Sequence, residues 1–140
     1  MKRFPISRAL VNKVGENITM FPVEDGVIIE KNEFVVVNTR TFQASLPKKE
    51  SGYISVGRAT EIITTEDGIT LVLCRDGIFK CQNSKDWKHR IGKGDYGRDC
   101  FFEDDQTVSL NNKSGIKAGT VINLDDGVWI KIDVNERGGN

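Results

Sequence analysis

The stretch Thr120–Val134, which reads TVINLDDGVWIKIDV, contains the pattern that decides the fold class. An alternation of apolar and polar residues with a period of two is typical of a strand with one buried face. An Asp-Gly pair before such a run favours a hairpin because glycine accepts positive φ, and we expect Gly127 to adopt it. The stretch therefore predicts an antiparallel β-hairpin at Asp126-Gly127. Its aliphatic face carries Val128, Ile130, Ile132 and Val134.

The length of the loop decides which side chains face one another in this hairpin. A two-residue loop would mix polar and aliphatic side chains on each face. A three-residue loop, Asp125–Gly127, places Leu124 opposite Val128. It also places Ile122 opposite Ile130, so the aliphatic side chains share one face. Because a slip of one residue inverts every side chain, we predict the three-residue register.

Three further Asp-Gly pairs interrupt the chain, at Asp25-Gly26, Asp67-Gly68 and Asp76-Gly77. The same reasoning predicts a second hairpin with the loop Arg75-Asp76-Gly77. In that hairpin Cys74 points away from Cys81, so we expect no disulfide between them. The predicted core face of this hairpin consists of Ile69, Leu71, Leu73, Phe79 and Cys81.

The composition of the whole chain favours strands. Val, Ile and Thr number 13, 14 and 9, whereas Ala, Leu and Met number 4, 6 and 2. Branched side chains suit a pleated surface, and good helix formers are scarce. We predict an all-β fold, a compact β-barrel or β-sandwich of about ten short strands. The expected strands are Ile18–Phe21, Val27–Ile29, Phe34–Val37, Tyr53–Thr64, Ile69–Cys74, Ile78–Gln82, Asp99–Phe102, Thr107–Leu110, Thr120–Leu124 and Val128–Val134.

Length and charge restrict the class of protein. The 140 residues predict one β domain, residues 17–140, after an N-terminal arm, residues 1–16. Twenty basic residues balance twenty acidic ones, so the net charge is zero. Proteins that bind nucleic acids or anionic membranes are usually basic. The three cysteines form neither a disulfide framework nor a zinc pattern. No signal peptide and no membrane-spanning run is evident, so we expect a chain that folds in the cytoplasm.

The arm Met1–Glu16 is the first candidate contact segment. It is basic, with a single acid at its end. One interpretation is that the arm adds a strand to an exposed edge of a partner. The other is that it forms a strand or short helix already docked on its own barrel. Its candidate partner-contact residues are Lys2, Arg3, Phe4 and Arg8.

The segment Asn83–Arg98 is the second candidate, because it combines basic and aromatic residues without a strand pattern. It is either a binding loop or a solvated connection. Its candidate partner-contact residues are Trp87, Lys88 and Arg90. An alternative function, a nucleic-acid-binding barrel, would use stacking and phosphate contacts here. That function would rest on Trp87, Lys88, Arg90, Lys93 and Tyr96.

The residues that catalysis requires are sparse. His89 is the sole histidine and lies between two cations, so we interpret it as a solvated side chain. No glycine-rich phosphate loop is present. The acidic run Glu103–Asp105 predicts a turn rather than a cation site. We therefore predict no catalytic, metal-binding or cofactor-binding residue and no enzyme, with an enzyme centred on His89 or Cys100 as a remote alternative.

From Ser55 onward the chain resembles the capsid cement, or head decoration, proteins of tailed bacteriophages and Mu-like prophages. The resemblance rests on the order and spacing of short segments over about 80 residues. The N-terminal third matches in outline through the Gly26 turn, Phe34–Val37 and Phe42–Ser45, and the more basic Asn83–Arg98 departs from the family pattern. The matching segments are Val56–Ala59, Gly77–Lys80, Asn83-Ser84, Gly97–Val108, Lys117–Val121 and Leu124–Ile130.

This resemblance implies a non-enzymatic β-barrel-like subunit that binds the outside of an assembled head. Its partners would be the major capsid protein and copies of itself, as a dimer or trimer. It would occupy the bacterial cytoplasm during assembly and then the outer capsid surface of the virion. In this interpretation Phe79, Val108 and Val128 pack inward. The residues implied to set turns are Gly77, Gly97, Gly119 and Gly127.

Trp129 is a further candidate partner-contact residue. It lies on the polar face of the last predicted hairpin. Aromatic residues are enriched at the centres of interfaces, so Trp129 could anchor a neighbour. The alternative is a second hydrophobic layer within the same subunit.

Overall fold

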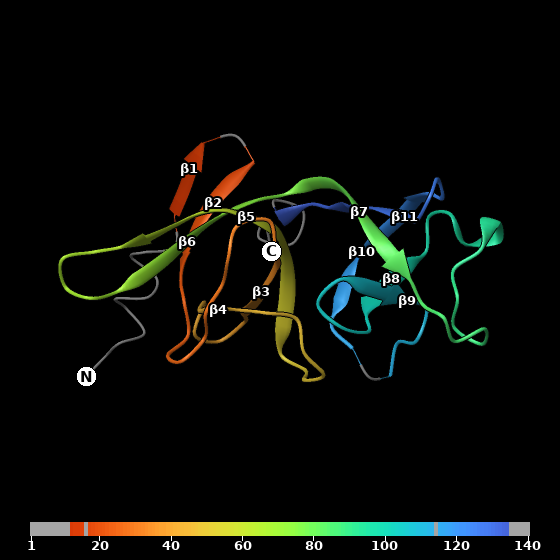
Figure 1. Cartoon of the computed structure of the whole chain (residues 1–140), viewed down its shortest axis with the longest axis horizontal. Coiled ribbons are helices and arrows are strands. Elements are labelled where there is room, and N and C mark those ends of the chain that lie inside the picture. Colours follow the sequence, from red (N-terminus) through yellow and green to blue (C-terminus); the bar gives the residue numbers. More distant parts are fainter. Residues whose placement is uncertain (1–11, 16, 114, 135–140) are drawn as a thin grey trace.

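The computed structural model describes residues 12–15, 17–113 and 115–134, and these residues form an all-β molecule. It consists of a six-stranded sheet and a small closed barrel that lie next to each other along the long axis (Figure 1). The described helical structure is the short 3-10 turn η1 (Lys93–Asp95) and Val134, which is helical rather than the end of the predicted strand Val128–Val134. The prediction of an all-β fold is therefore confirmed.

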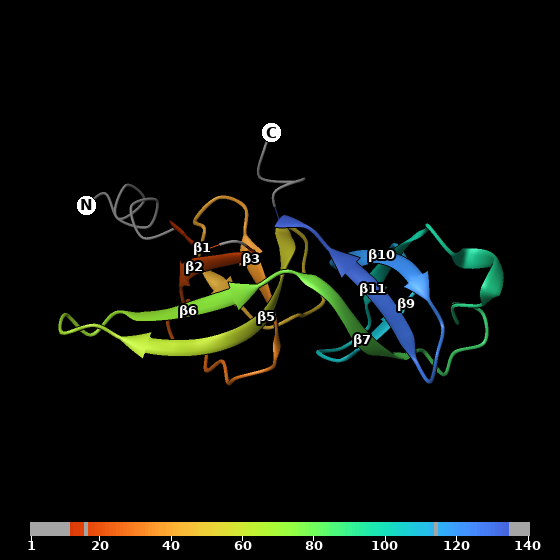
Figure 2. The same cartoon turned by 90° about the horizontal axis from the view of Figure 1, so that it is seen from above.

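The sheet is antiparallel, with strand order β1-β2-β6-β5-β3-β4. The longest strand, β5, forms a hairpin with β6 around Asp67-Gly68, as that Asp-Gly pair predicts. Figure 2 shows this hairpin extending away from the body of the molecule. The strands are β1 (Asn12–Gly15), β2 (Ile18–Pro22), β3 (Phe34–Asn38), β4 (Ala44–Ser45), β5 (Tyr53–Thr64) and β6 (Thr70–Arg75).

The barrel contains the second half of the chain and closes in the order β10-β11-β7-β9-β8. Its neighbours are antiparallel except for the parallel pair of β7 and β9. Closure leaves the barrel without a sheet edge that runs its full length. The strands are β7 (Gly77–Asn83), β8 (Asp99–Phe102), β9 (Thr107–Ser109), β10 (Lys117–Asn123) and β11 (Val128–Ile132).

Strand β3 joins the two hydrophobic cores. Phe34 and Val36 belong to the core inside the barrel, whereas Val35 and Val37 belong to the core of the six-stranded sheet. Successive side chains of a strand point in opposite directions, so one strand can supply both cores. This explains why β3 is an unbroken apolar run instead of an alternating one. The shared strand holds the sheet and barrel together.

The hairpin predicted at Asp76-Gly77 is wrong. Strand β6 pairs with β2 on one side and β5 on the other, so β7 has no free edge of β6 to pair with. The chain instead leaves the sheet at Asp76 and enters the barrel, where β7 pairs with β11 and β9. The predicted common core face is wrong for the same reason, because Cys74 belongs to the sheet core and Cys81 to the barrel core. Both cysteines are free and buried, which confirms the absence of a disulfide between them.

The strand predicted at Val27–Ile29 is also wrong. Asp25-Gly26 forms a turn, but the segment that follows it is a loop. Ile29 is buried and Ile28 is 78% exposed, so the side chains alternate although no strand forms. Strands β2 and β3 each lie between two neighbours in the sheet, and Val27–Ile29 pairs with neither of them. The segment is thus a loop that places Ile29 in the sheet core.

The last hairpin confirms the predicted turn and corrects the register beyond it. Next to the turn, Asn123 lies opposite Trp129, as the three-residue loop requires. A β-bulge then shifts the pairing, so that Val121 rather than Ile122 lies opposite Ile130. A bulge adds one residue to one strand and rotates the side chains that follow. The bulge therefore exposes Ile122 and buries Val121.

The four glycines expected to set turns do not all do so. Gly97 and Gly127 lie in turns with positive φ angles of 86° and 137°, whereas Gly77, with a φ of 139°, is the first residue of β7, where the chain crosses from the sheet to the barrel without turning back. Gly119 instead lies inside β10, so the expectation of a turn there is wrong. A Cβ atom at Gly119 would lie 2.6 Å from the carbonyl oxygen of Lys131. Gly119 thus permits the close approach of β10 and β11.

The predicted arm is a strand over its described part. Asn12–Gly15 pairs with β2 of the same chain, as in the interpretation of an arm docked on its own molecule. The candidate contact residues Lys2, Arg3, Phe4 and Arg8 lie outside the described residues. Phe79, Val108 and Val128 pack in or against the barrel core, as the resemblance implies.

Candidate functional site

The loop between β7 and β8, here called the barrel-end loop (Ser84–Arg98), is attached firmly to the barrel. Ile91 is buried in the barrel core at 3% exposure. The side chain of Asn83 accepts a hydrogen bond from the Ile91 N–H and donates one to the Ile91 carbonyl oxygen, at 3.0 and 2.9 Å. The N–H of Leu110 donates to the His89 carbonyl oxygen at 2.9 Å. These contacts fix the middle of the loop.

Both ends of the barrel-end loop are also fixed. At its start, the Ser84 hydroxyl donates to Glu103 at 2.6 Å and accepts from the Asp86 N–H at 3.1 Å. At its end, the Gly97 N–H donates to the Val121 carbonyl oxygen at 2.7 Å. A loop held at its start, middle and end loses little conformational entropy when it binds a partner.

The barrel-end loop exposes its aromatic and basic side chains. Trp87 is 79% exposed and Tyr96 is 49% exposed. No ion pair links Lys85, Lys88 or Lys93 to another residue in the described part of the chain. Arg90 is exposed as well, although its guanidinium donates to the Ser84 carbonyl oxygen at 3.3 Å. The loop thus groups the predicted contact residues Trp87, Lys88 and Arg90 on a preformed support.

A second surface, here called the outer barrel face, lies on the adjacent strands β7, β11 and β10. It contains Ile78, which is 57% exposed, and Ile122, which is 38% exposed. Trp129 points to the same side between them, since β11 alternates between buried and accessible residues and β7 pairs with it. Lys80 lies opposite Trp129 and Lys131 opposite Ile78, and the Lys80 ammonium is paired with Asp126 at 3.5 Å. The face therefore combines apolar side chains with two cations.

Trp129 also stabilises its own hairpin. Its indole N–H donates to the Asp125 carbonyl oxygen at 2.9 Å. This hydrogen bond holds the ring across the β10–β11 turn, and the side chain remains partly accessible. Sequence reasoning identified Trp129 but missed Ile78 and Ile122. The sequence did contain a signal for Ile78. Neighbouring residues of a strand point to opposite faces, so the inward-facing Phe79 implies that Ile78 faces outward.

The groups considered for catalysis lie in different environments. His89 lies in the barrel-end loop, whereas Cys100 is fully buried in the barrel, where its thiol donates to the Gly119 carbonyl oxygen at 3.5 Å. Burial raises the pKa of Cys100 to about 12 and that of Cys81 to about 12. Burial also raises the pKa of the Cys74 thiol. A thiol reacts as the thiolate, so these cysteines are poor nucleophiles near neutral pH.

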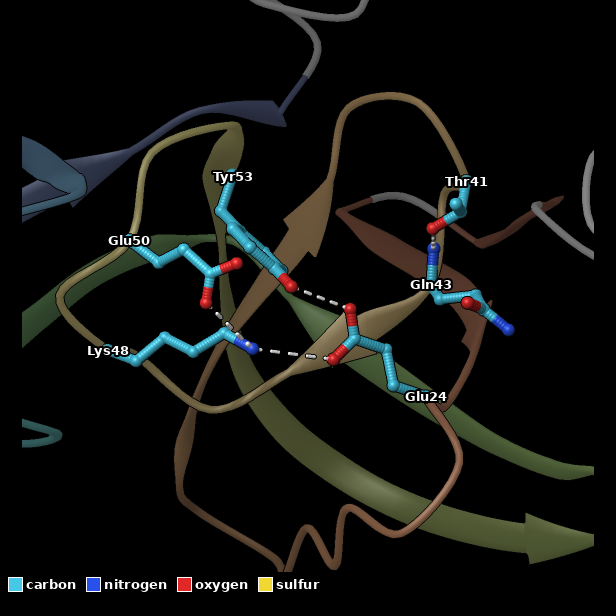
Figure 3. Close-up of polar contacts among 6 residues, drawn as sticks. All are labelled: Glu24, Thr41, Gln43, Lys48, Glu50 and Tyr53. Atoms are coloured by element: carbon cyan, nitrogen blue, oxygen red, sulfur yellow. Dashed lines mark hydrogen bonds and ion pairs between the residues drawn. The ribbon is translucent and has the colours of Figure 1, made fainter.

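A polar cluster joins the loops of the sheet, as Figure 3 shows. The Tyr53 hydroxyl donates to Glu24 at 2.7 Å, and the Lys48 ammonium lies 3.6 Å from Glu24 and 3.7 Å from Glu50. Hydrogen bonding to Tyr53 and the nearby carboxylates raise the pKa of Lys48, although partial burial opposes them. A lysine acts as a nucleophile when its pKa is lowered, whereas this cluster raises the pKa of Lys48. We interpret the cluster as a structural contact that links the loops of the sheet.

A small open pocket of about 240 Å³ lies between the barrel-end loop and the β10–β11 turn, lined in part by Arg90, Leu124 and Asp126. This volume is below the usual range for small-molecule sites, about 300–1,000 Å³. Within the described ranges, no group of three or more potential metal ligands comes together. No helix in the same ranges has the length and apolar character needed to cross a membrane.

The chain was compared with protein-family models, with curated proteins and with solved structures, and no match was found in any of the three.

Proposed function

We propose that the chain is a non-enzymatic structural protein of a phage or prophage, a capsid cement subunit that binds and stabilises the assembled major capsid shell. Two considerations support this proposal: the resemblance from Ser55 onward and the outer barrel face. The observation that carries it is the apolar row Ile78–Trp129–Ile122 on three adjacent strands, in which both isoleucines are exposed and Trp129 is partly accessible.

The outer barrel face has the composition of a protein-binding surface. The solvent side of an antiparallel strand usually carries polar side chains, so exposed isoleucines beside a tryptophan call for a partner. Complete burial of one isoleucine contributes about 1.5–3 kcal/mol. Association costs at least about 4 kcal/mol, so a few such contacts give modest affinity. Modest affinity suits a capsid because many identical sites are displayed on one shell.

The proposal is tested by binding to purified heads. We expect the full chain to co-sediment with expanded heads of the phage or prophage that encodes it, and its gene to lie beside that of the major head protein. The variant Ile78→Glu should bind at least about tenfold more weakly, since it places a charge in the apolar row. Ile28→Glu is the matched control because Ile28 is 78% exposed but lies in a loop of the sheet.

Unchanged binding of Ile78→Glu, with circular dichroism showing the folded state, would exclude the outer barrel face as the capsid contact. Failure of the wild-type chain to bind its heads at low and at high salt would refute the capsid function itself. Reduced binding by both isoleucine variants would indicate a general loss of solubility and would also count against this surface.

A second candidate function is single-stranded nucleic-acid binding through the barrel-end loop. The exposed Trp87 and Tyr96 favour it, since aromatic side chains stack on bases beside cations. It predicts binding to an oligonucleotide that weakens steeply with salt and is lost in Lys88→Glu with Arg90→Glu. The acids Asp86 and Asp95 within the same loop argue against it, because they repel phosphate.

A further inference from the structure

The tip of the β5–β6 hairpin is an isolated two-stranded ribbon, here called the acidic ribbon (Thr60–Thr70). Strand β3 pairs with β5 as far as Arg58, and β2 pairs with β6 as far as Leu71. The Val23 N–H donates to the Thr70 carbonyl oxygen at 2.9 Å, and beyond this hydrogen bond the outer edges of the ribbon have no strand beside them in the described part of the chain. Two strands alone are marginally stable in water, and an open edge invites a partner.

The acidic ribbon carries only negative charge. It contains Glu61, Glu66 and Asp67 and no lysine or arginine. All three acids are exposed, and none forms an ion pair with another described residue. Ile63 is 39% exposed on the same ribbon. The ribbon thus offers an apolar contact surrounded by carboxylates that have no counter-charge of their own.

The barrel-end loop has the complementary composition. It contains five cations and two acids, with Trp87 and Tyr96 as exposed apolar contacts. One of these acids, Asp95, is already paired with Arg98 at 3.0 Å. The excess of three cations in the loop matches the three acids of the ribbon in number and is opposite in sign.

The two surfaces cannot meet within one molecule. Figures 1 and 2 place the ribbon at one end of the long axis and the barrel-end loop at the other. Complementary surfaces at opposite ends of one chain produce a head-to-tail contact between copies. Such a contact closes into a ring if the rotation between copies permits and otherwise continues as an open chain.

We propose that the occupant of the barrel-end loop is the acidic ribbon of a second copy of this chain. Each copy then donates its ribbon to one neighbour and accepts a ribbon on its loop from another. The outer barrel face takes no part in this contact and remains available to a different partner. The inference is independent of the proposed capsid function, since it requires no protein other than this chain.

Reciprocal charge reversal tests this proposal by sedimentation analysis of the full chain. The wild type should associate at an ionic strength of about 0.01 M and dissociate at least tenfold more readily at about 0.15 M, because screening shortens the range of the attraction. A ribbon variant, Glu61→Lys with Glu66→Lys, should be a monomer. A loop variant, Lys85→Glu with Lys88→Glu, should be a monomer as well.

A mixture of the two variants provides the decisive result. The cationic ribbon of one variant then faces the anionic loop of the other, and the reverse contact is also complementary, so association should return. A misfolded variant could not regain binding in this way. The control Glu30→Lys with Asp105→Lys makes the same change of charge at exposed acids outside the ribbon and should associate like the wild type.

Several outcomes would overturn the proposal. A wild-type chain that stays monomeric at low ionic strength at every concentration would do so. Variants that associate separately but gain nothing on mixing would also do so. A monomer whose loop binds an oligonucleotide, with the loop variant losing that binding, would assign the barrel-end loop to nucleic acid instead of a second copy.

Discussion

Replacement of Gly57 by alanine tests how the sheet is joined to the barrel. Gly57 lies in β5 with a φ of +111°, where the pairing with β3 contains a bulge. A Cβ atom at this position would lie 2.0 Å from the carbonyl oxygen of Arg75 and 3.0 Å from Cα of Asp76. These atoms belong to the backbone of the crossover from β6 to β7, so they cannot move aside as the end of a side chain could.

Gly77→Ala is the matched comparison because Gly77 also has a positive φ, +139°, but a Cβ atom there would meet nothing within 4 Å. Both substitutions place alanine in an unfavourable backbone region, which costs about 1–3 kcal/mol. Gly57→Ala must in addition displace the crossover, and overpacking of this kind costs about 1–3 kcal/mol more. The difference between the two variants therefore isolates the collision with Arg75.

The measurements are the free energy of unfolding, from urea denaturation, and Tm, from thermal denaturation, both followed by far-UV circular dichroism. For a chain of this size each 1 kcal/mol lowers Tm by about 2–4 °C. We expect Gly57→Ala to melt roughly 2–12 °C below Gly77→Ala, from that slope and the overpacking cost. Equal destabilisation of the two variants would refute the close approach of β5 to the crossover, and with it the path of the chain between sheet and barrel.

Further predictions concern the contact of Arg58 with Phe34, the loss of stability at acidic pH and the reactivity of the cysteines. The Arg58 guanidinium lies 4.5 Å from the centre of the Phe34 ring, so the variant Arg58→Met should be less stable than the wild type by about 0.5–2 kcal/mol in the same urea assay. The control Arg75→Met should leave the stability nearly unchanged, because Arg75 is exposed. Burial raises the pKa of Asp104, but hydrogen bonds from Gln106 and Thr107 outweigh it, so the net pKa lies below the ordinary value of 3.8. A lowered pKa stabilises the fold above 3.8, and this contribution disappears as the pH falls through the folded pKa; the gap in Tm between wild type and Asp104→Asn should therefore stay constant above 3.8 and narrow below it. The three buried cysteines should react with a thiol reagent only as fast as the protein unfolds, so rapid modification of the native chain at neutral pH would contradict their burial.

Much of the candidate site could be located from the sequence, but its accessibility could not. The combination of Trp87 with neighbouring cations identifies the barrel-end loop as unusual. Which side chains of the loop face solvent depends on how the loop is anchored. Ile91 is buried in the barrel core, and the Asn83 side chain binds the Ile91 backbone. These contacts join residues whose individual signals are weak. The outer barrel face was missed because β7 is distant in sequence from β10 and β11, and because the bulge in β10 turns Ile122 outward.

The sequence by itself determined the fold class, most strand positions and the turns at Asp67-Gly68 and Asp126-Gly127. These are local properties, since the period of two and the positive φ of glycine depend on neighbouring residues. The tertiary structure decided which strands pair. It made Asp76-Gly77 a crossover instead of a hairpin because both edges of β6 were occupied, and it placed the two faces of β3 in two cores. Alternation specifies that a side chain is buried, whereas competition for free strand edges specifies where it is buried.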